Sequence, residues 1–206
     1  IEDYDKLYQK NQPEETLRHK AFYAPNGEKI LMHISNFRKV KRIEDVLQVF
    51  DRVRKKIPAK LLLIGDGPER NHIERLCREL NTCDDVKLLG KVISPEELLL
   101  LADLFLLPSE TESFGLAALE AMASHVPVIS SNTGGIPEVN LHGISGYLSE
   151  VGDVDDMASN AIKILSDDNT LIKFKQQAYE QSLKFDIHKI LPMYETLYHA
   201  VVGIKQ

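Results

Sequence analysis

The sequence contains little of what marks several special classes of protein. Cysteine occurs only twice, at Cys77 and Cys83, and neither residue belongs to a set with the spacing of zinc ligands. We therefore expect two reduced thiols in a cytoplasmic protein. No apolar run approaches the roughly 20 residues that a membrane-spanning helix requires, so we expect no stable membrane span. Internal repeats are absent as well, which excludes a repeat architecture.

Positive charge is also in short supply. Lysine and arginine number 25 against 31 aspartates and glutamates, which gives a formal net charge of -6 at pH 7. Nucleic acids are bound through basic surfaces, and the basic run at residues 38–42 is too short to provide one. The 206 residues, 43% of them hydrophobic, suffice for one domain with a sizeable core. We expect a globular domain that does not bind nucleic acid.

Short apolar runs alternate with helical patterns through the middle of the chain. The runs have the length and flanking turn residues of strands. They cover residues 30–35, 61–65, 86–90, 104–109, 127–131 and 146–150. The segment 43–56 between the first two has the apolar spacing of a helix, and helical patterns also lie between the later runs. This alternation predicts the α/β class, with a doubly wound parallel sheet covered by helices on both faces.

The two ends of the chain differ from this pattern. Residues 1–27 are polar and lack a sustained period, and we expect them to be a linker from an N-terminal domain that the sequence does not include. Residues 28–185 then form the α/β domain. From residue 153 onward the patterns are helical, and we assign residues 186–206 to a C-terminal helix that crosses back to the other domain, with a kink at Pro192.

Loops rich in glycine, proline and charge follow the predicted strands. In a doubly wound sheet, ligands bind beyond the carboxyl ends of the strands. Residues 113–116 and 134–137 are loops of this kind that could each present free backbone N–H groups at a helix N-terminus, which suits a phosphate. In the first loop, Gly115 lets the backbone approach a ligand closely. A glycine-rich turn can equally be structural, so both interpretations stay open for both loops.

Glu120 stands out in the segment that follows. Every other residue from 114 to 123 is small, aromatic or aliphatic, and a helix of this kind is normally buried. Burying a carboxylate without a partner is costly or raises its pKa. Glu120 therefore either finds hydrogen-bond donors inside the protein or faces a bound ligand.

The motifs together resemble a known family. ESFGLAALEAMA, preceded by ADLFLLPS and followed by PVISSNTGGIPEV, resembles the signature of glycosyltransferase family 4, retaining enzymes with the two-domain GT-B architecture. The resemblance covers most of residues 30–165 and includes LLLIGDGPER, VKLLGKV and GISGYL. The segment ISNFRKVKRIEDVL is closer still to members that transfer N-acetylglucosamine from UDP-GlcNAc to L-malate in bacillithiol biosynthesis. The resemblance implies that this chain is the Rossmann-like, donor-binding half of such an enzyme, and that the acceptor is bound mainly by the other domain.

The resemblance implies a role for each matching residue around the helix that contains Glu120. Glu120 would accept hydrogen bonds from the ribose hydroxyls of the nucleotide, and Glu112 would contact hydroxyls of the transferred sugar. Backbone N–H groups of the loop between them would hold the diphosphate or a sugar oxygen. The residues of that loop are Ser113, Phe114, Gly115 and Leu116.

Further roles fall on the loops after the first three strands. Lys41 would neutralise the leaving diphosphate. Most family members have Gly-Arg where this sequence has Ser35-Asn36, so the usual arginine is missing and Arg38 is the candidate to replace it. Val92 resembles the residue whose backbone pairs with uracil, and Gly65-Asp66 would line the same edge of the cleft.

Other interpretations remain open. Asp153, Asp155 and Asp156 superficially resemble the metal-binding carboxylates of other glycosyltransferases, but they lie at a predicted helix start, where Asp is a common cap. We expect no metal and no cofactor. His33 and His125 are expected to be packing or turn residues. The rival functions are a family 4 transferase with another acceptor and a non-catalytic nucleotide-binding or interaction module. The oligomeric state stays open, a homo-oligomer included.

Overall fold

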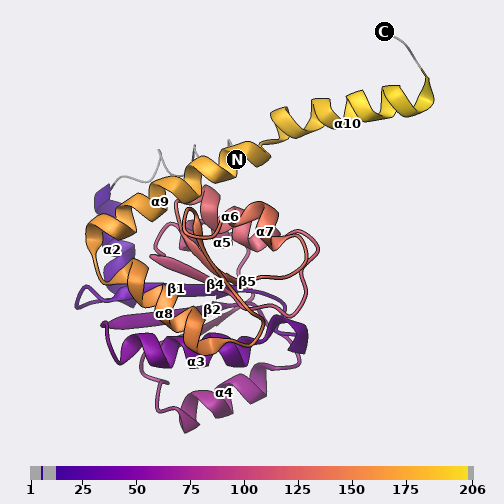
Figure 1. The fold of residues 1–206 in the computed structure, drawn as a ribbon. Coiled ribbons are helices and arrows are strands. Elements are labelled where there is room, and N and C mark those ends of the chain that lie inside the picture. The colour runs from indigo at the N-terminus through magenta and orange to yellow at the C-terminus, as the bar shows by residue number, and fades with distance from the viewer. Residues whose placement is uncertain (1–5, 7–12, 204–206) are drawn as a thin grey trace.

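Six parallel strands form a sheet in the order β3-β2-β1-β4-β5-β6 (Figure 1). The structure is a computed structural model, and it describes residue 6 and residues 13–203. The strands are β1 (Lys29–Ile34), β2 (Ala59–Ile64), β3 (Val86–Gly90), β4 (Leu104–Leu107), β5 (Val128–Ser131) and β6 (Gly146–Ser149). All six lie where the apolar runs predicted them, and the doubly wound α/β class is confirmed.

Helices cover both faces of this sheet. They are α2 (Pro13–Tyr23), α3 (Ile43–Arg54), α4 (Arg70–Glu79), α5 (Pro95–Leu99), α6 (Leu116–Ala123), α7 (Ile136–Val139), α8 (Val154–Leu165), α9 (Asp168–Ser182) and α10 (Ile187–Val202), with short 3-10 turns η1 (Lys39–Lys41) and η2 (Leu183–Phe185). Helices α3, α4 and α8 lie on one face, and α5, α6 and α7 lie on the other (Figure 1). No helix in the described part of the chain is long and apolar enough to cross a membrane.

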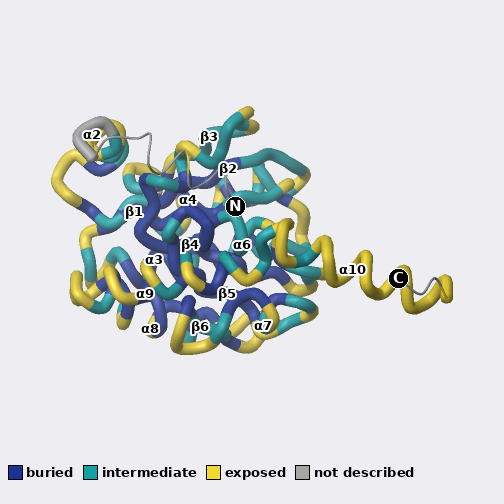
Figure 2. The backbone as a smooth tube through the Cα atoms, turned by 90° about the horizontal axis from the view of Figure 1, so that it is seen from above, coloured by how far each residue is buried: buried dark blue, intermediate teal, exposed yellow. Residues whose placement is uncertain are grey.

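The strands are continuous apolar runs because both faces of a parallel sheet are buried. In β2, Leu61 and Leu63 pack into the core cluster under α3, while Leu62 and Ile64 pack into the cluster under α6. Figure 2 shows this buried backbone concentrated in the strands. Successive side chains of a strand alternate between its faces, so no polar residue is needed within the run.

Helix α9 crosses from one layer to the other at the amino ends of the strands. Its Phe174 belongs to the cluster under α3, and Ala178 belongs to the cluster under α6. Between them, Lys175 reaches Asp103, which directly precedes β4. Lys29, the first residue of β1, pairs with Asp168 at the start of α9 at 2.6 Å. The helix thus closes the edge of the sheet opposite the carboxyl ends.

Asp103 anchors this amino edge. Its carboxylate is buried and accepts hydrogen bonds from Lys20 of α2 at 2.7 Å, Lys175 at 3.1 Å and the N–H of Ile30 at 2.9 Å. Burial acts to raise the pKa of Asp103, but the Lys175 and Lys20 ammonium groups outweigh it and hold the pKa below its usual value. One ionised side chain therefore ties α2, β1 and α9 together.

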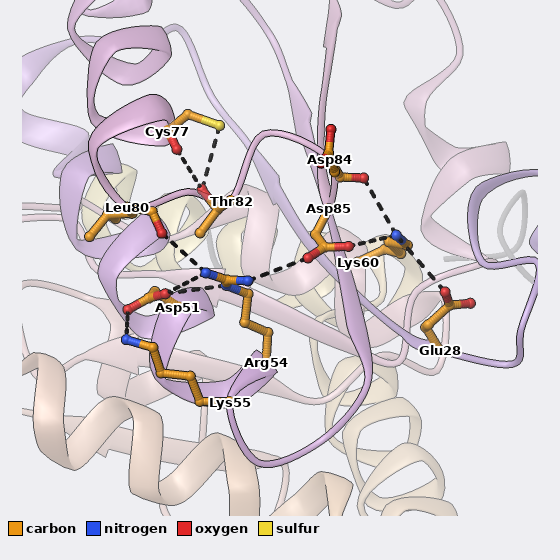
Figure 3. A network of polar contacts seen from close by, with 10 residues as sticks. All are labelled: Glu28, Asp51, Arg54, Lys55, Lys60, Cys77, Leu80, Thr82, Asp84 and Asp85. Atoms are coloured by element: carbon orange, nitrogen blue, oxygen red, sulfur yellow. Dashed lines mark hydrogen bonds and ion pairs between the residues drawn. The ribbon is translucent and has the colours of Figure 1, made fainter.

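A second polar network fastens the end of α3 to the loop before β3 (Figure 3). Arg54 donates to the Leu80 carbonyl at 3.1 Å and pairs with Asp51 at 3.1 Å and Asp85 at 3.6 Å. Asp85 also binds Lys60 of β2 at 2.6 Å. Basic residues at the end of a helix complement its dipole, and here they also link neighbouring elements.

The two cysteines lie beside this network. Both are free, with Cys77 buried on α4 and Cys83 exposed, as the expectation of reduced thiols requires. Burial raises the pKa of the Cys77 thiol to about 11. Cys77 therefore stays protonated at neutral pH and behaves as an apolar core residue.

The ends of the chain differ in part from expectation. Residues 13–23, assigned to a linker, form helix α2, and the remaining residues of that assignment before 13, apart from residue 6, lie outside the described residues. The helix is mostly polar and docks through the ion pair of Lys20 and through Tyr23 at its end, so it has no apolar period that the sequence could show. Helix α10 runs on through Pro192, is exposed along its length and extends away from the sheet (Figure 2).

We expect Asp103→Ala to lower the free energy of unfolding by about 3 kcal/mol, because it leaves two ammonium groups without their counter-charge in a largely buried site. Asp155→Ala is the matched control. Its carboxylate is 84% exposed and pairs with Arg52, so we expect a change below about 1 kcal/mol. Urea unfolding followed by circular dichroism measures both. Equal losses would show that Asp103 is no more important than a surface ion pair.

Candidate functional site

A crevice is expected where β1 and β4 separate. The two strands pair only between Leu31 and Leu104 and between Met32 and Phe105. The chain then leaves β1 toward α3 on one face and leaves β4 toward α6 on the other. Ligands of open α/β sheets bind at such a switch point, beyond the carboxyl ends of the strands. The loops that the sequence singled out meet at this edge.

Lys41 and Glu112 come together at this edge. The ammonium Nζ of Lys41 lies 2.5 Å from Glu112 Oε1, and the hydroxyl of Ser109 donates to the same oxygen at 2.9 Å. The two charged side chains are 22% and 14% exposed. Lys41 arrives from η1 after β1, and Glu112 arrives from the loop after β4. The sequence named both residues but not their pairing.

The two glycine loops have different roles. A Cβ atom on Gly134 would lie 1.8 Å from the Glu112 carbonyl oxygen, and one on Gly135 would lie 2.3 Å from that of Ser113. The N–H of Gly135 donates to the Glu112 carbonyl at 3.1 Å. Gly134 and Gly135 therefore have a structural role, because they let one loop support the backbone of the other.

The loop at the start of α6 has the form expected of an anion site. Gly115 precedes the first helical residue, Leu116, with a left-handed φ of 90°. No side chain caps this N-terminus. The N–H groups of a first helical turn have no partner within the helix, so they stay available to an acceptor. Ser113 is exposed and Phe114 is partly buried against Phe185.

Glu120 is the one charged residue of the apolar helix α6. Its carboxylate is partly buried and has no hydrogen bond or ion pair with any residue that the structure describes. Burial raises the pKa of Glu120, and the nearby Glu96 of α5 raises it further. The described residues supply no donor to this carboxylate, and a partly buried carboxyl group with a raised pKa is a candidate for contact with a ligand.

The other predicted residues line the same edge with fewer contacts. Arg38 is exposed and forms no ion pair within the described chain. Gly65 has a φ of 125° and lies against the carbonyl of Ser35, where a Cβ atom would come within 1.7 Å. Glycine is therefore required at position 65, because the loop after β1 packs directly against it. Asp66 accepts a hydrogen bond from the next N–H at 2.9 Å, and Val92 is partly buried below the β3 loop.

His33, which the sequence analysis expected to be a packing or turn residue, is packed inside β1 near this edge and makes hydrogen bonds that the sequence did not predict. It is fully buried in β1, with Nδ1 2.8 Å from the Leu106 carbonyl and Nε2 2.8 Å from Ser35 Oγ. A carbonyl only accepts, so Nδ1 carries the proton and Nε2 accepts from the serine hydroxyl. Burial lowers the pKa of His33 from 6.5 to about 4. One polar residue inside an apolar strand was the signal that could have revealed it.

The acidic stretch after β6 is a helix cap. Asp153 accepts a hydrogen bond from the N–H of Asp156 at 2.9 Å at the start of α8, as the cap interpretation predicted. Asp155 pairs with Arg52 of α3. Within the described residues, no group of three His, Cys, Asp or Glu side chains is placed to hold a metal ion.

Comparison with known structures gives the class. The domain superposes on Anabaena HepE in its complex with UDP and glucose with a TM-score of 0.84 and 23% identity, over 94% of this chain and 54% of that one. S. aureus TarM, in a complex that includes UDP, gives a TM-score of 0.78 and 28% identity over 83% of this chain and 35% of that one. The fold is the C-terminal Rossmann-like domain of GT-B glycosyltransferases.

The family follows from the sequence match. The model of the family described as glycosyl transferases group 1 matches residues 15–181, and the chain belongs to this family. It is 49% identical over 187 residues to the N-acetyl-alpha-D-glucosaminyl L-malate synthase of Bacillus anthracis. That alignment covers 89% of this chain and 48% of the relative, so the chain spans about half of that protein's length.

The buried imidazole of His33 predicts a pH dependence of stability. The pKa of His33 is about 4 in the folded state against 6.5 ordinarily, so its stabilisation is complete above pH 6.5 and is lost as the pH falls toward 4. We expect acidification from pH 7 to 5 to lower the free energy of unfolding of the wild type by about 2 kcal/mol more than that of the His33→Gln variant, because glutamine does not titrate. Urea unfolding at both pH values tests this. Identical losses would contradict the buried neutral imidazole.

Proposed function

We propose that the chain is the donor-binding domain of a retaining glycosyltransferase that transfers N-acetylglucosamine from UDP-GlcNAc to L-malate. The observation that carries the proposal is the partly buried carboxylate of Glu120, which has no partner among the described residues, on the helix that follows the loop where Lys41 and Glu112 pair. The 49% identity to the Bacillus anthracis synthase supports the choice of sugar and acceptor. The two free cysteines are consistent with a cytoplasmic location.

The donor would extend along the carboxyl edge of the sheet. Glu120 accepts two hydrogen bonds from the ribose diol, which satisfies an ionised carboxylate that has no other partner. The backbone of Val92 pairs with the uracil base, in the loop after β3. The diphosphate lies at the uncapped N-terminus of α6, formed by residues 113–116, where the helix dipole favours negative charge.

Transfer needs the leaving diphosphate to be stabilised. Lys41 is placed to neutralise it, and the exposed guanidinium of Arg38 is free to join, so this chemistry requires no divalent ion. In the structure Lys41 is paired with Glu112. When the donor binds, the ammonium turns to the phosphates and the carboxylate to the sugar hydroxyls. The acceptor then attacks from the face of the leaving group, and the departing phosphate takes its proton.

The acceptor and the rest of the catalytic cleft belong to the other half of the polypeptide. Helix α10 presents large apolar side chains to solvent, including Met193 at 66% and Tyr198 at 66% exposed. An apolar groove of about 740 Å³ lies between the first part of α10 and Leu116 and Leu119 of α6. We propose that the N-terminal domain packs against this surface, since exposed apolar patches of this kind mark interfaces.

The isolated chain is expected to bind UDP and UDP-GlcNAc weakly and to transfer no sugar, because it holds the donor loops but lacks the acceptor domain. Titration calorimetry with UDP, ADP and UDP-GlcNAc measures the first part. An assay with UDP-GlcNAc and L-malate measures the second. A preference for ADP would overturn the choice of nucleotide, and turnover by this chain alone would overturn the division between domains.

We expect substitutions of Glu120 and Glu112 to have different effects on UDP binding and on transfer. Glu120→Gln keeps the volume and one acceptor oxygen but removes the charge, so UDP and UDP-GlcNAc should both bind about 1 to 3 kcal/mol more weakly. Glu112→Gln should not lower the affinity for UDP, because the carboxylate of Glu112 repels the diphosphate and competes with it for Lys41. In the full-length enzyme it should lower the rate of transfer.

Calorimetry gives the UDP affinity of both variants, and thermal melting checks their folding. Glu138→Gln, on α7, is the control for loss of a carboxylate near the site. If Glu112→Gln lowers the affinity for UDP as much as Glu120→Gln does, or if Glu120→Gln binds UDP with wild-type affinity, the assignment of the ribose and the sugar to different glutamates is wrong.

A further inference from the structure

The hydrogen bonds of His33 continue into the loop that carries Arg38 and Lys41. The ring links the Leu106 carbonyl of β4 to the hydroxyl of Ser35, and Ser35 Oγ in turn accepts a hydrogen bond from the N–H of Phe37 at 3.3 Å. The chain of contacts therefore starts on β4, crosses β1 and ends in the backbone just before Arg38.

The backbone at Phe37 needs such support. Its φ of 39° lies in the left-handed region, which is unfavourable for a bulky residue. The ring is fully buried in the core cluster under α3, and the Phe37 carbonyl accepts a hydrogen bond from the N–H of Glu69 at 3.0 Å. The Ser35 hydroxyl accepts from the N–H of Phe37, on the other side of the same residue. The turn at Phe37 is thus held from three directions.

This turn sets where the two cations point. Arg38 follows it directly, and η1 then brings Lys41 back through the hydrogen bond of the Lys41 N–H to the Arg38 carbonyl at 2.8 Å. A change of the Phe37 backbone would therefore move both side chains together. The loop after β4 is linked to η1 as well, because the N–H of Glu110 donates to the Val40 carbonyl at 2.8 Å.

We propose that His33 is a positioning residue for the diphosphate of the donor, acting through Ser35 on the turn at Phe37 that directs Arg38 and Lys41. The inference rests on the proposed function, because those two cations are its proposed diphosphate contacts. An apolar residue at position 33 would fill the same space. It would leave the Leu106 carbonyl and the Ser35 hydroxyl without partners and release the turn.

The two nitrogens of the ring can be tested separately. Asparagine places its amide near the position of Nδ1, so His33→Asn can keep the bond to Leu106 but loses the one to Ser35. Glutamine is longer and places its carbonyl near Nε2, so His33→Gln keeps an acceptor for Ser35. Ser35→Ala removes the same link from the other side. Ser131→Ala is the matched control, because Ser131 is a fully buried serine at the end of β5 whose hydroxyl has no partner among the described residues.

The experiment compares UDP with uridine, which lacks the diphosphate, on the 206-residue chain. We expect His33→Asn and Ser35→Ala to lower the affinity for UDP about tenfold and to leave the affinity for uridine unchanged, since one hydrogen bond that orders a charged loop is lost. His33→Gln should recover most of the UDP affinity. The double variant of His33→Asn and Ser35→Ala should be no weaker than Ser35→Ala, because both changes break one link.

Amide hydrogen exchange supplies a readout that needs no ligand. Residues 37–42 should exchange faster in His33→Asn and Ser35→Ala than in the wild type, while α8 and the Ser131→Ala control stay unchanged. Equal losses of UDP and uridine affinity, or unchanged exchange in residues 37–42, would overturn the inference. If the wild type binds no UDP, the proposed function fails and the role at the diphosphate fails with it, while the exchange data still decide whether His33 and Ser35 hold the turn.

Discussion

The parallel pairing of β1 with β4 is the constraint on which the rest of the structure depends. The strands share only two residue pairs before the chain leaves them toward opposite faces of the sheet. Because all six strands are parallel, every loop after a strand lies at one edge, and the separation of β1 from β4 marks the crevice expected there. Lys41 and Glu112 reach across it from the two sides. Without this separation the two side chains would have no common space.

Charge is handled differently at the two edges of the sheet. At the amino edge, the buried carboxylate of Asp103 is matched by Lys20 and Lys175, and this pairing holds three elements together. At the carboxyl edge, Glu120 is left without a partner in the described chain and lies near a second carboxylate, Glu96. A partly buried carboxylate without a protein partner is a feature of binding sites, and it is the observation from which we propose that this edge holds the donor.

Local pattern was enough to predict most of the fold. Buried parallel strands are continuous apolar runs, and all six were visible as such. The sequence analysis did not predict helix α2, because its side chains are mostly polar and its contacts with the domain, the ion pair of Lys20 and the packing of Tyr23, form no apolar period. The candidate site was predicted in its residues but not in its contacts. Gly134 and Gly135 were ambiguous because a glycine required by a neighbouring backbone and one required by a ligand look alike in a sequence.

By itself the sequence determined the alternation of strands and helices, the edge where the loops gather, and the family, because each of these follows from residues close together along the chain. Only the tertiary structure decided which side chains meet. Lys41 and Glu112 are 71 positions apart, and His33 is 73 positions from the Leu106 carbonyl that fixes its tautomer. Such partners are brought together by the order of the strands in the sheet and by their register. These are properties of packing over the whole domain, and a local pattern does not contain them.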